Sequence, residues 1–269
     1  MPVESECAAN PAAISGSFRP ENILSTFDND DIAGNWKITV TDTVPHDVGK
    51  FNQWCIAAQI HNTPTTPPDP PSPEPLPEQA VVTGVTGRGQ ALPLDCESRS
   101  AIDWAKYYGT TINELEFFYA LPVSDNPDLG FVGNVYGTWG QIPPHPYGVH
   151  AEPVAEQLRE YGLAAYTHHP LTWDDLRAEI AAGKPVITWI VGSNYPGYYV
   201  YVVNGIPEYY SSKQGNHSVV SRFEHTVIVT GYSPDSVTYL NGGTINRVSR
   251  HQFLESWSVL GNMAITSQP

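Results

Sequence analysis

The chain has 269 residues, and 13 Lys and Arg against 28 Asp and Glu give it a formal net charge of −15 at pH 7. This acidity argues against binding to nucleic acid or anionic lipid, because both require a basic surface. Apolar residues make up 41% of the chain, which is enough for a folded core. The longest apolar runs, such as Val186–Val191, are too short to span a membrane.

The N-terminal segment, residues 1–61, has the pattern of an antiparallel β structure. Apolar residues alternate with polar ones in Gly34–Asp42 and again in Phe51–Ile60, as in half-buried strands. The intervening Thr43–Lys50 contains Pro, Asp and Gly, which favour turns. A β-sandwich needs roughly 100 residues, so this segment is expected to be only part of one.

These residues resemble the C-terminal half of the P domain (Homo B) found beside subtilisin-like proprotein convertases. The resemblance covers roughly residues 14–60 and is carried by Leu24–Phe27, Gly34–Trp36, Val40–Asp42, Asp47–Gly49 and Trp54. It implies a jelly-roll β-sandwich in a secreted protein, with no active site in this part. Its acidic residues predict a solvated acidic loop, and a structural Ca²⁺ held by them is the alternative. Those residues are Asp28, Asp30, Asp31, Asp42 and Asp47.

Residues 62–79 are rich in proline and predict a semi-rigid linker of extended polyproline II geometry. Of the three cysteines, Cys7 and Cys55 precede this linker and Cys96 follows it. In an oxidising compartment the first two could form a disulfide and leave Cys96 free. Three unpaired cysteines are the alternative.

Beyond the linker, residues 80–269 predict an α+β domain, with helices first and an antiparallel sheet afterwards. Helices are indicated by apolar spacing of three and four residues, by glycine stops and, at Thr172–Asp175, by a capping box. They are expected at Asp95–Tyr108, Ile112–Ala120, Glu152–Tyr161 and after Thr172, with a late helix at His251. Strands are expected at Pro185–Val191, Tyr198–Val203, His225–Tyr232, Ser236–Leu240 and Asn262–Thr266.

Cys96 is the candidate nucleophile, because it opens the helix predicted at Asp95–Tyr108. The free amide groups and the helix dipole at that end favour a thiolate, which is the reactive form of cysteine. Gln90 lies six residues upstream in the loop, where its amide could donate to an oxyanion together with the Cys96 N–H. Taken alone, a cysteine in such a position is more often a small buried core residue than a nucleophile.

His225 is the candidate general base, because it begins an apolar strand where a histidine has no obvious structural purpose. The predicted hairpin turns near Pro234, so residues 241–243 return opposite His225 and Asn241 is the partner expected to orient the ring. Asp235 lies at the far end of the hairpin and is excluded by distance. The other histidines show no metal-binding spacing, so no metal site is predicted.

These residues resemble the C39-like branch of papain-fold cysteine peptidases, over nearly all of residues 80–266. The resemblance is carried by Gln90–Ser98, Gly183–Val186, Glu224–Tyr232, Phe253–Trp257 and Gly261–Ile265. It implies a papain-like fold with Gln90 as oxyanion donor, Cys96 as nucleophile, His225 as base and acid, and the third position as orienter. The family usually has Asp in that position, whereas this chain has Asn241, which supplies no negative charge to the imidazolium.

The sequence therefore predicts a secreted cysteine peptidase that acts on peptide or protein substrates through a Cys96 acyl-thioester and requires no cofactor. Secretion is expected although no export signal is visible at Met1. A catalytically silent peptide- or cell-wall-binding module, or another thiol-dependent acyl transferase or amidase, remains the alternative. Tyrosines within Tyr195–Tyr210 either line a peptide groove or lie on strand surfaces.

Overall fold

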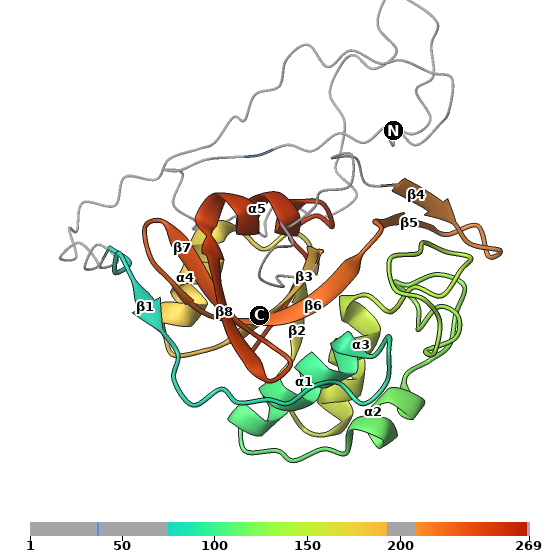
Figure 1. Ribbon diagram of the computed structural model, residues 1–269, viewed down its shortest axis with the longest axis horizontal. Helices are drawn as coiled ribbons and strands as arrows, with labels where there is room; N and C mark the ends of the chain where they lie inside the picture. Colours follow the sequence, from blue (N-terminus) through green and yellow to red (C-terminus); the bar gives the residue numbers. More distant parts are fainter. Residues whose placement is uncertain (1–36, 38–74, 193–207, 268–269) are drawn as a thin grey trace, which may run out of the picture. The chain divides into compact units, whose positions relative to one another are not determined.

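The computed structural model describes Lys37 and residues 75–192 and 208–267 (Figure 1). Several predictions lie outside these residues: the N-terminal β module with its possible Ca²⁺ ligands, the Cys7–Cys55 pair, most of the linker and the strand Tyr198–Val203. In the part that is described, Cys96 is a free, buried cysteine.

A mixed fold of helices and an antiparallel sheet is present, as the sequence predicted. The main sheet runs in the order β2-β9-β3-β6-β7-β8, and β1 also pairs with β6. Its strands are β1 (Ala80–Val81), β2 (Tyr166–His168), β3 (Val186–Val191), β6 (Glu224–Tyr232), β7 (Ser236–Asn241), β8 (Thr244–Ser249) and β9 (Ala264–Thr266). A separate two-stranded ribbon consists of β4 (Glu208–Ser211) and β5 (His217–Val220).

The helices begin and end close to the predicted positions. They are α1 (Cys96–Tyr107), α2 (Glu114–Ala120), α3 (Ala151–Glu160), α4 (Trp173–Ala181) and α5 (Arg250–Ser258). The capping box predicted before α4 is confirmed. The Thr172 hydroxyl accepts a hydrogen bond from Asp175 N, and the Asp175 carboxylate accepts one from Thr172 N. Among the described residues, no helix is long and apolar enough to cross a bilayer.

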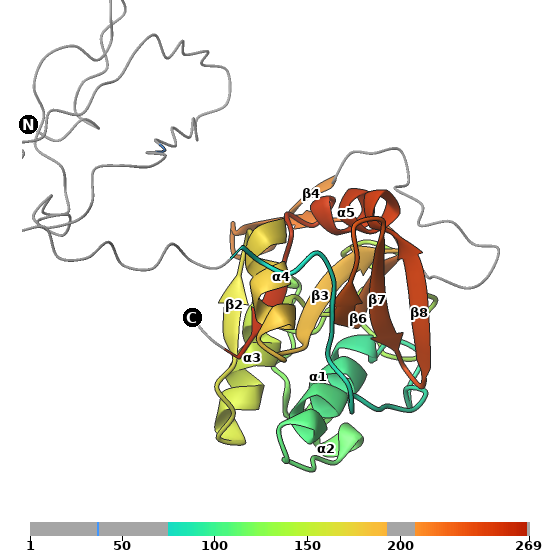
Figure 2. The same cartoon turned by 90° about the vertical axis from the view of Figure 1, so that its left-hand side faces the viewer.

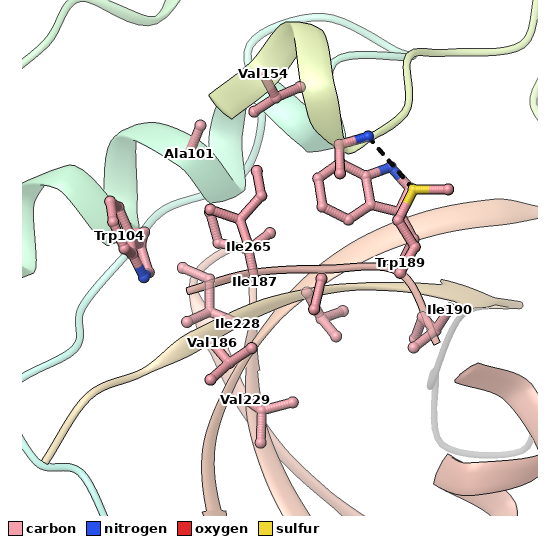
Figure 3. Close-up of a cluster of buried hydrophobic side chains, with 14 of the residues drawn as sticks. Ala101, Trp104, Val154, Val186, Ile187, Trp189, Ile190, Ile228, Val229 and Ile265 are labelled. Atoms are coloured by element: carbon pink, nitrogen blue, oxygen red, sulfur yellow. Dashed lines mark hydrogen bonds between the residues drawn. The ribbon is translucent and has the colours of Figure 1, made fainter. Parts of the chain in front are cut away.

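The core lies between the sheet and the helices that cover it, with α1 and α3 on the side seen in Figure 3. There, Ala101 of α1 and Val154 of α3 face Ile187 and Ile265 of the sheet (Figure 3), and all four are almost fully buried. Figure 2 shows α5 on the side of the sheet away from α1. Trp104 fixes the position of α1 along its own axis relative to the sheet. Its Nε1 donates a hydrogen bond of 2.8 Å to Pro185 O, just before β3.

Five strands were not predicted: β1, β2, β4, β5 and β8. Among these, β8 matters most for the site, because it forms a hairpin with β7. Asn241 and Thr244 are the last paired residues of the hairpin, and the two residues between them form its loop. Gly242 takes a positive φ of 55° there, a conformation that glycine adopts without strain. The Gly-Gly pair between two alternating segments was the available hairpin signal.

Candidate active site

Cys96 is the first residue of α1, and the N–H groups of the first turn have no partner within the helix. Packing of α1 on β6 fixes its position: Ser100, one turn on, donates its hydroxyl to Thr226 O at 3.1 Å. The sulfur itself lies 3.3 Å from Glu97 Oε2 and 4.0 Å from Thr226 Oγ1. Burial raises the pKa of the thiol well above its ordinary value, and the charges of Glu97 and Glu224 add to this.

Glu97 and Glu224 place two carboxyl groups beside the thiol, although their exposed fractions are only 1% and 3%. One oxygen of each and the sulfur all lie within 4.8 Å of one another. Glu97 Oε1 accepts from Val149 N at 2.7 Å, and Glu224 Oε1 accepts from the Thr226 hydroxyl at 3.4 Å. Burial raises the pKa of Glu97 to about 7 and that of Glu224 well above its usual range.

His225 lies on β6, and its Nε2 is 2.8 Å from Asn241 Oδ1 on β7. An amide oxygen only accepts, so Nε2 carries the hydrogen and Nδ1 keeps the lone pair that can take a proton. Burial lowers the pKa of His225, and the bond to Asn241 acts in the opposite direction. The imidazole is therefore neutral near pH 7, which is the form that a general base needs.

Trp139 packs edge-on against His225, with ring centroids 6.4 Å apart. It is held there because its Nε1 donates to Glu224 O at 2.8 Å and its ring meets Phe223 at a centroid distance of 5.0 Å. Gly140 is needed beside it, since a Cβ there would lie 2.6 Å from a Phe223 ring carbon. The indole thus covers one side of the imidazole.

The Cys96 thiol and the His225 imidazole lie on opposite faces of β6. The imidazole belongs to a residue of the strand, and the thiol contacts the next residue, Thr226. Side chains alternate across a strand, so Thr226, which contacts the sulfur, points to the face opposite His225. Within the described residues, no hydrogen bond joins Cys96 to His225: the sulfur contacts Glu97 and Thr226, and the imidazole contacts Asn241. Transfer of a proton between them therefore requires the sulfur to leave its contacts with Glu97 and Thr226.

Gln90 lies in the loop that leads to α1, but its amide points at the loop itself. Its Nε2 donates to Leu92 O and to Pro93 O, both at 2.9 Å. Both amide hydrogens are therefore engaged, and one of these bonds must break before Gln90 can serve an oxyanion.

The loop before Cys96 is held in place by a buried ionic network. Glu114 of α2 accepts from Ala91 N, Arg88 and Arg99, each at 2.8 Å, and Arg99 of α1 also pairs with Asp103. The same loop packs on the β7–β8 turn, because a Cβ at Gly87 would lie 2.5 Å from Gly242 O. This packing connects the backbone near Gln90 with the hairpin that carries Asn241.

Cys96, Glu97 and Glu224 form the one group of potential metal ligands found in the described residues. Metal binding requires a deprotonated thiol and deprotonated carboxyl groups, whereas burial favours the protonated form of all three. The chemistry of this group therefore fits bound protons better than a bound cation.

Sequence reasoning missed Glu97, Glu224, Thr226 and Trp139. A signal was present for the two glutamates, because one directly follows the candidate nucleophile and the other directly precedes the candidate base. A charged residue next to Cys96 and another next to His225 are unexpected, because both segments pack into a core. Trp139 lies in a loop far from either motif, and nothing in the pattern around it indicated its position.

The helix-borne cysteine, the histidine on an adjacent antiparallel strand and its amide partner on the next strand together define a cysteine peptidase fold. The model of the Peptidase C39 like family matches residues 93–265. The chain belongs to this family. The matched segment contains Cys96, His225 and Asn241 and begins three residues after Gln90. The model of the proprotein convertase P-domain matches residues 9–58, which confirms the second resemblance.

Among the solved structures that this chain resembles, one supports the same fold. A Bacillus anthracis protein assigned as a C39-like peptidase is 22% identical with a TM-score of 0.61, covering 72% of this chain and 98% of that one. The peptidase domain of Streptococcus ComA is 13% identical with a TM-score of 0.40 and coverages of 69% and 100%. Xylellain, a cysteine protease from Xylella fastidiosa, is 15% identical with a TM-score of 0.40 and coverages of 72% and 87%. A search of curated proteins gave no match.

Proposed function

We propose that this protein is a secreted cysteine peptidase in which Cys96 attacks the peptide carbonyl carbon and His225 takes the thiol proton. The observation that carries the proposal is the 2.8 Å hydrogen bond from His225 Nε2 to Asn241 Oδ1, which leaves Nδ1 with the free lone pair that a general base needs. The P-domain match supports export, because that module belongs to secreted proteins. The N-terminal module would then serve folding, docking or spacing outside the cell.

In the proposed reaction, the thiol proton moves to His225 Nδ1 and the sulfur forms a bond to the carbonyl carbon. The resulting oxyanion is stabilised by the Cys96 N–H at the start of α1 and by one hydrogen of the Gln90 amide. His225 then gives its proton to the leaving amine as the C–N bond breaks, which leaves an acyl-thioester. Water hydrolyses the thioester, releases the carboxylic acid and restores the thiol.

The test compares the full-length chain with its Cys96→Ala variant on a broad peptide library, with products identified by mass spectrometry. We expect cleavage by the wild type and none by the variant. Equal cleavage by both would remove Cys96 from the mechanism. An added amine acceptor separates plain hydrolysis from acyl transfer, because transfer would place the amine in the product.

A catalytically silent peptide-binding module is the second candidate, and one observation favours it. The sulfur is hydrogen-bonded to Glu97, and its pKa is raised, which is the opposite of an activated nucleophile. A silent module would show no cleavage of any peptide in the library and a Cys96 that resists iodoacetamide over the whole pH range from 5.5 to 8.5. Wild-type cleavage would exclude this candidate.

A further inference from the structure

The described residues supply no counter-charge to the two carboxyl groups beside Cys96. Within the described part of the chain, no Lys, Arg or His contacts Glu97 or Glu224. The buried Arg99 is bound to Asp103 and Glu114, and His150 is bound to Asp128 Oδ1 at 2.6 Å. A buried carboxylate without a cation is costly, so at least one of the two glutamates holds a proton.

The segment before α3 closes the space around these carboxyl groups. Val149 N donates to Glu97 Oε1, and a Cβ at Gly148 would lie 3.0 Å from Glu224 Oε2. The other titratable groups that face the pair are Tyr147 on the same segment and Asp95 at the start of α1, both buried. None of these groups supplies a positive charge, so protons are the species that can neutralise the pair.

We propose that Glu97 is a positioning residue for the nucleophile: when ionised it holds Cys96 as a thiol turned toward the carboxyl pair, and when protonated it releases the sulfur to His225. The 3.3 Å contact from Sγ to Glu97 Oε2 represents the held state, in which the sulfur has no bond to His225. This inference rests on the proposed function and adds a condition to it, namely mildly acidic surroundings.

The direction of the pH effect follows from charge. Above the pKa of Glu97, which burial raises to about 7, its carboxylate accepts from the thiol and repels a thiolate. Below that pH the repulsion disappears and the carboxyl no longer attracts the thiol hydrogen as a carboxylate does, so the sulfur is free to turn toward His225. Transfer of the thiol proton to His225 leaves the net charge unchanged, so it remains possible at acidic pH. Reactivity of Cys96 should therefore rise as pH falls from 8 to 6, which is opposite to an ordinary thiol.

The experiment measures the rate of Cys96 alkylation by iodoacetamide, an uncharged reagent, in the full-length chain from pH 5.5 to 8.5. Peptide mass mapping separates labelling at Cys96 from any labelling at Cys7 and Cys55, and free N-acetylcysteine alkylated under the same conditions serves as the reference. We expect the wild-type rate at Cys96 to fall between pH 6 and pH 8. In Glu97→Gln the fall should vanish, with a rate at pH 8 about tenfold above wild type, the factor for one pKa unit.

Glu156→Gln, on the exposed side of α3, is the matched control and should keep the wild-type profile. The inference is wrong if the wild-type rate rises with pH from 6 to 8, and this measurement needs no variant that might misfold. It is also wrong if a folded Glu97→Gln shows the wild-type profile. Failure of the proposed function looks different: the profile would change as expected while Cys96→Ala and wild type cleaved the peptide library equally.

Discussion

The imidazole of His225 is bound to the side-chain amide of Asn241 at 2.8 Å, across neighbouring antiparallel strands. A neutral amide stands where a carboxylate would stabilise the imidazolium more strongly. Asn241 fixes the ring orientation and the proton position but contributes no charge. The pKa of His225 is accordingly lowered by burial, because the bond to Asn241 only partly offsets desolvation.

Asn241→Ala should reduce kcat/KM by about a hundredfold, the usual cost of a misoriented catalytic group. Asn241→Asp should keep the ring in place and raise the pKa of His225, since a carboxylate at this distance favours the imidazolium. The pH dependence of kcat/KM and the His225 titration by NMR measure both effects. Asn246→Ala, on β8, is the control. An unchanged rate in Asn241→Ala would show that packing against Trp139 alone orients the ring.

Gln90→Ala tests whether the Gln90 amide donates to the oxyanion or only stabilises the loop before α1. If the amide turns to the oxyanion, kcat should fall by about 10²–10³ with little change in KM. Gln90→Glu should behave similarly, because it keeps the shape but cannot donate. If Gln90 only holds the loop through Leu92 O and Pro93 O, kcat stays near wild type and the melting temperature drops instead.

Glu114→Gln should destabilise the domain by about 3 kcal/mol. The carboxylate forms salt bridges with the guanidinium groups of Arg88 and Arg99, and the exposed fraction of Glu114 is only 2%. Arg99 would retain Asp103 as its partner, so the domain should still fold. Urea unfolding measures the loss. Glu116→Gln on the exposed side of α2 should change the free energy of unfolding little. Equal stability of the two variants would contradict a supporting role for this network.

Asp95→Asn should stabilise the protein at pH 8 and leave it nearly unchanged at low pH. Burial, followed by the charge of Glu114, raises the pKa of Asp95 from 3.8 to about 7. A raised carboxyl pKa gives a contribution to stability that is fully present below pH 3.8 and is lost as pH rises through about 7. Asparagine stays neutral at every pH, so the variant does not lose this contribution to stability as pH rises. Thermal melts at pH 4 and pH 8 measure the difference, and equal shifts at both would contradict the prediction.

Much of the fold was readable from local patterns. Apolar spacing and the following Gly109 gave α1 to within a residue at each end, and the capping box gave α4. These signals are local, because a helix satisfies its own backbone and shows its buried face as a sequence period. The short or edge strands escaped prediction. In β8, for example, Ile245 is 54% exposed, so its pairing with β7 leaves only a weak apolar pattern.

The sequence by itself determined the cysteine at a helix start, the histidine at a strand start and, through hairpin geometry, the amide that returns beside it. Those three positions follow from distances along the chain. The tertiary structure alone decided that Glu97 and Glu224 meet at the sulfur, because this contact arises where α1 docks across β6. Docking removes water from the thiol and from both carboxyl groups, and this desolvation raises the pKa of all three groups in a way that no sequence spacing records.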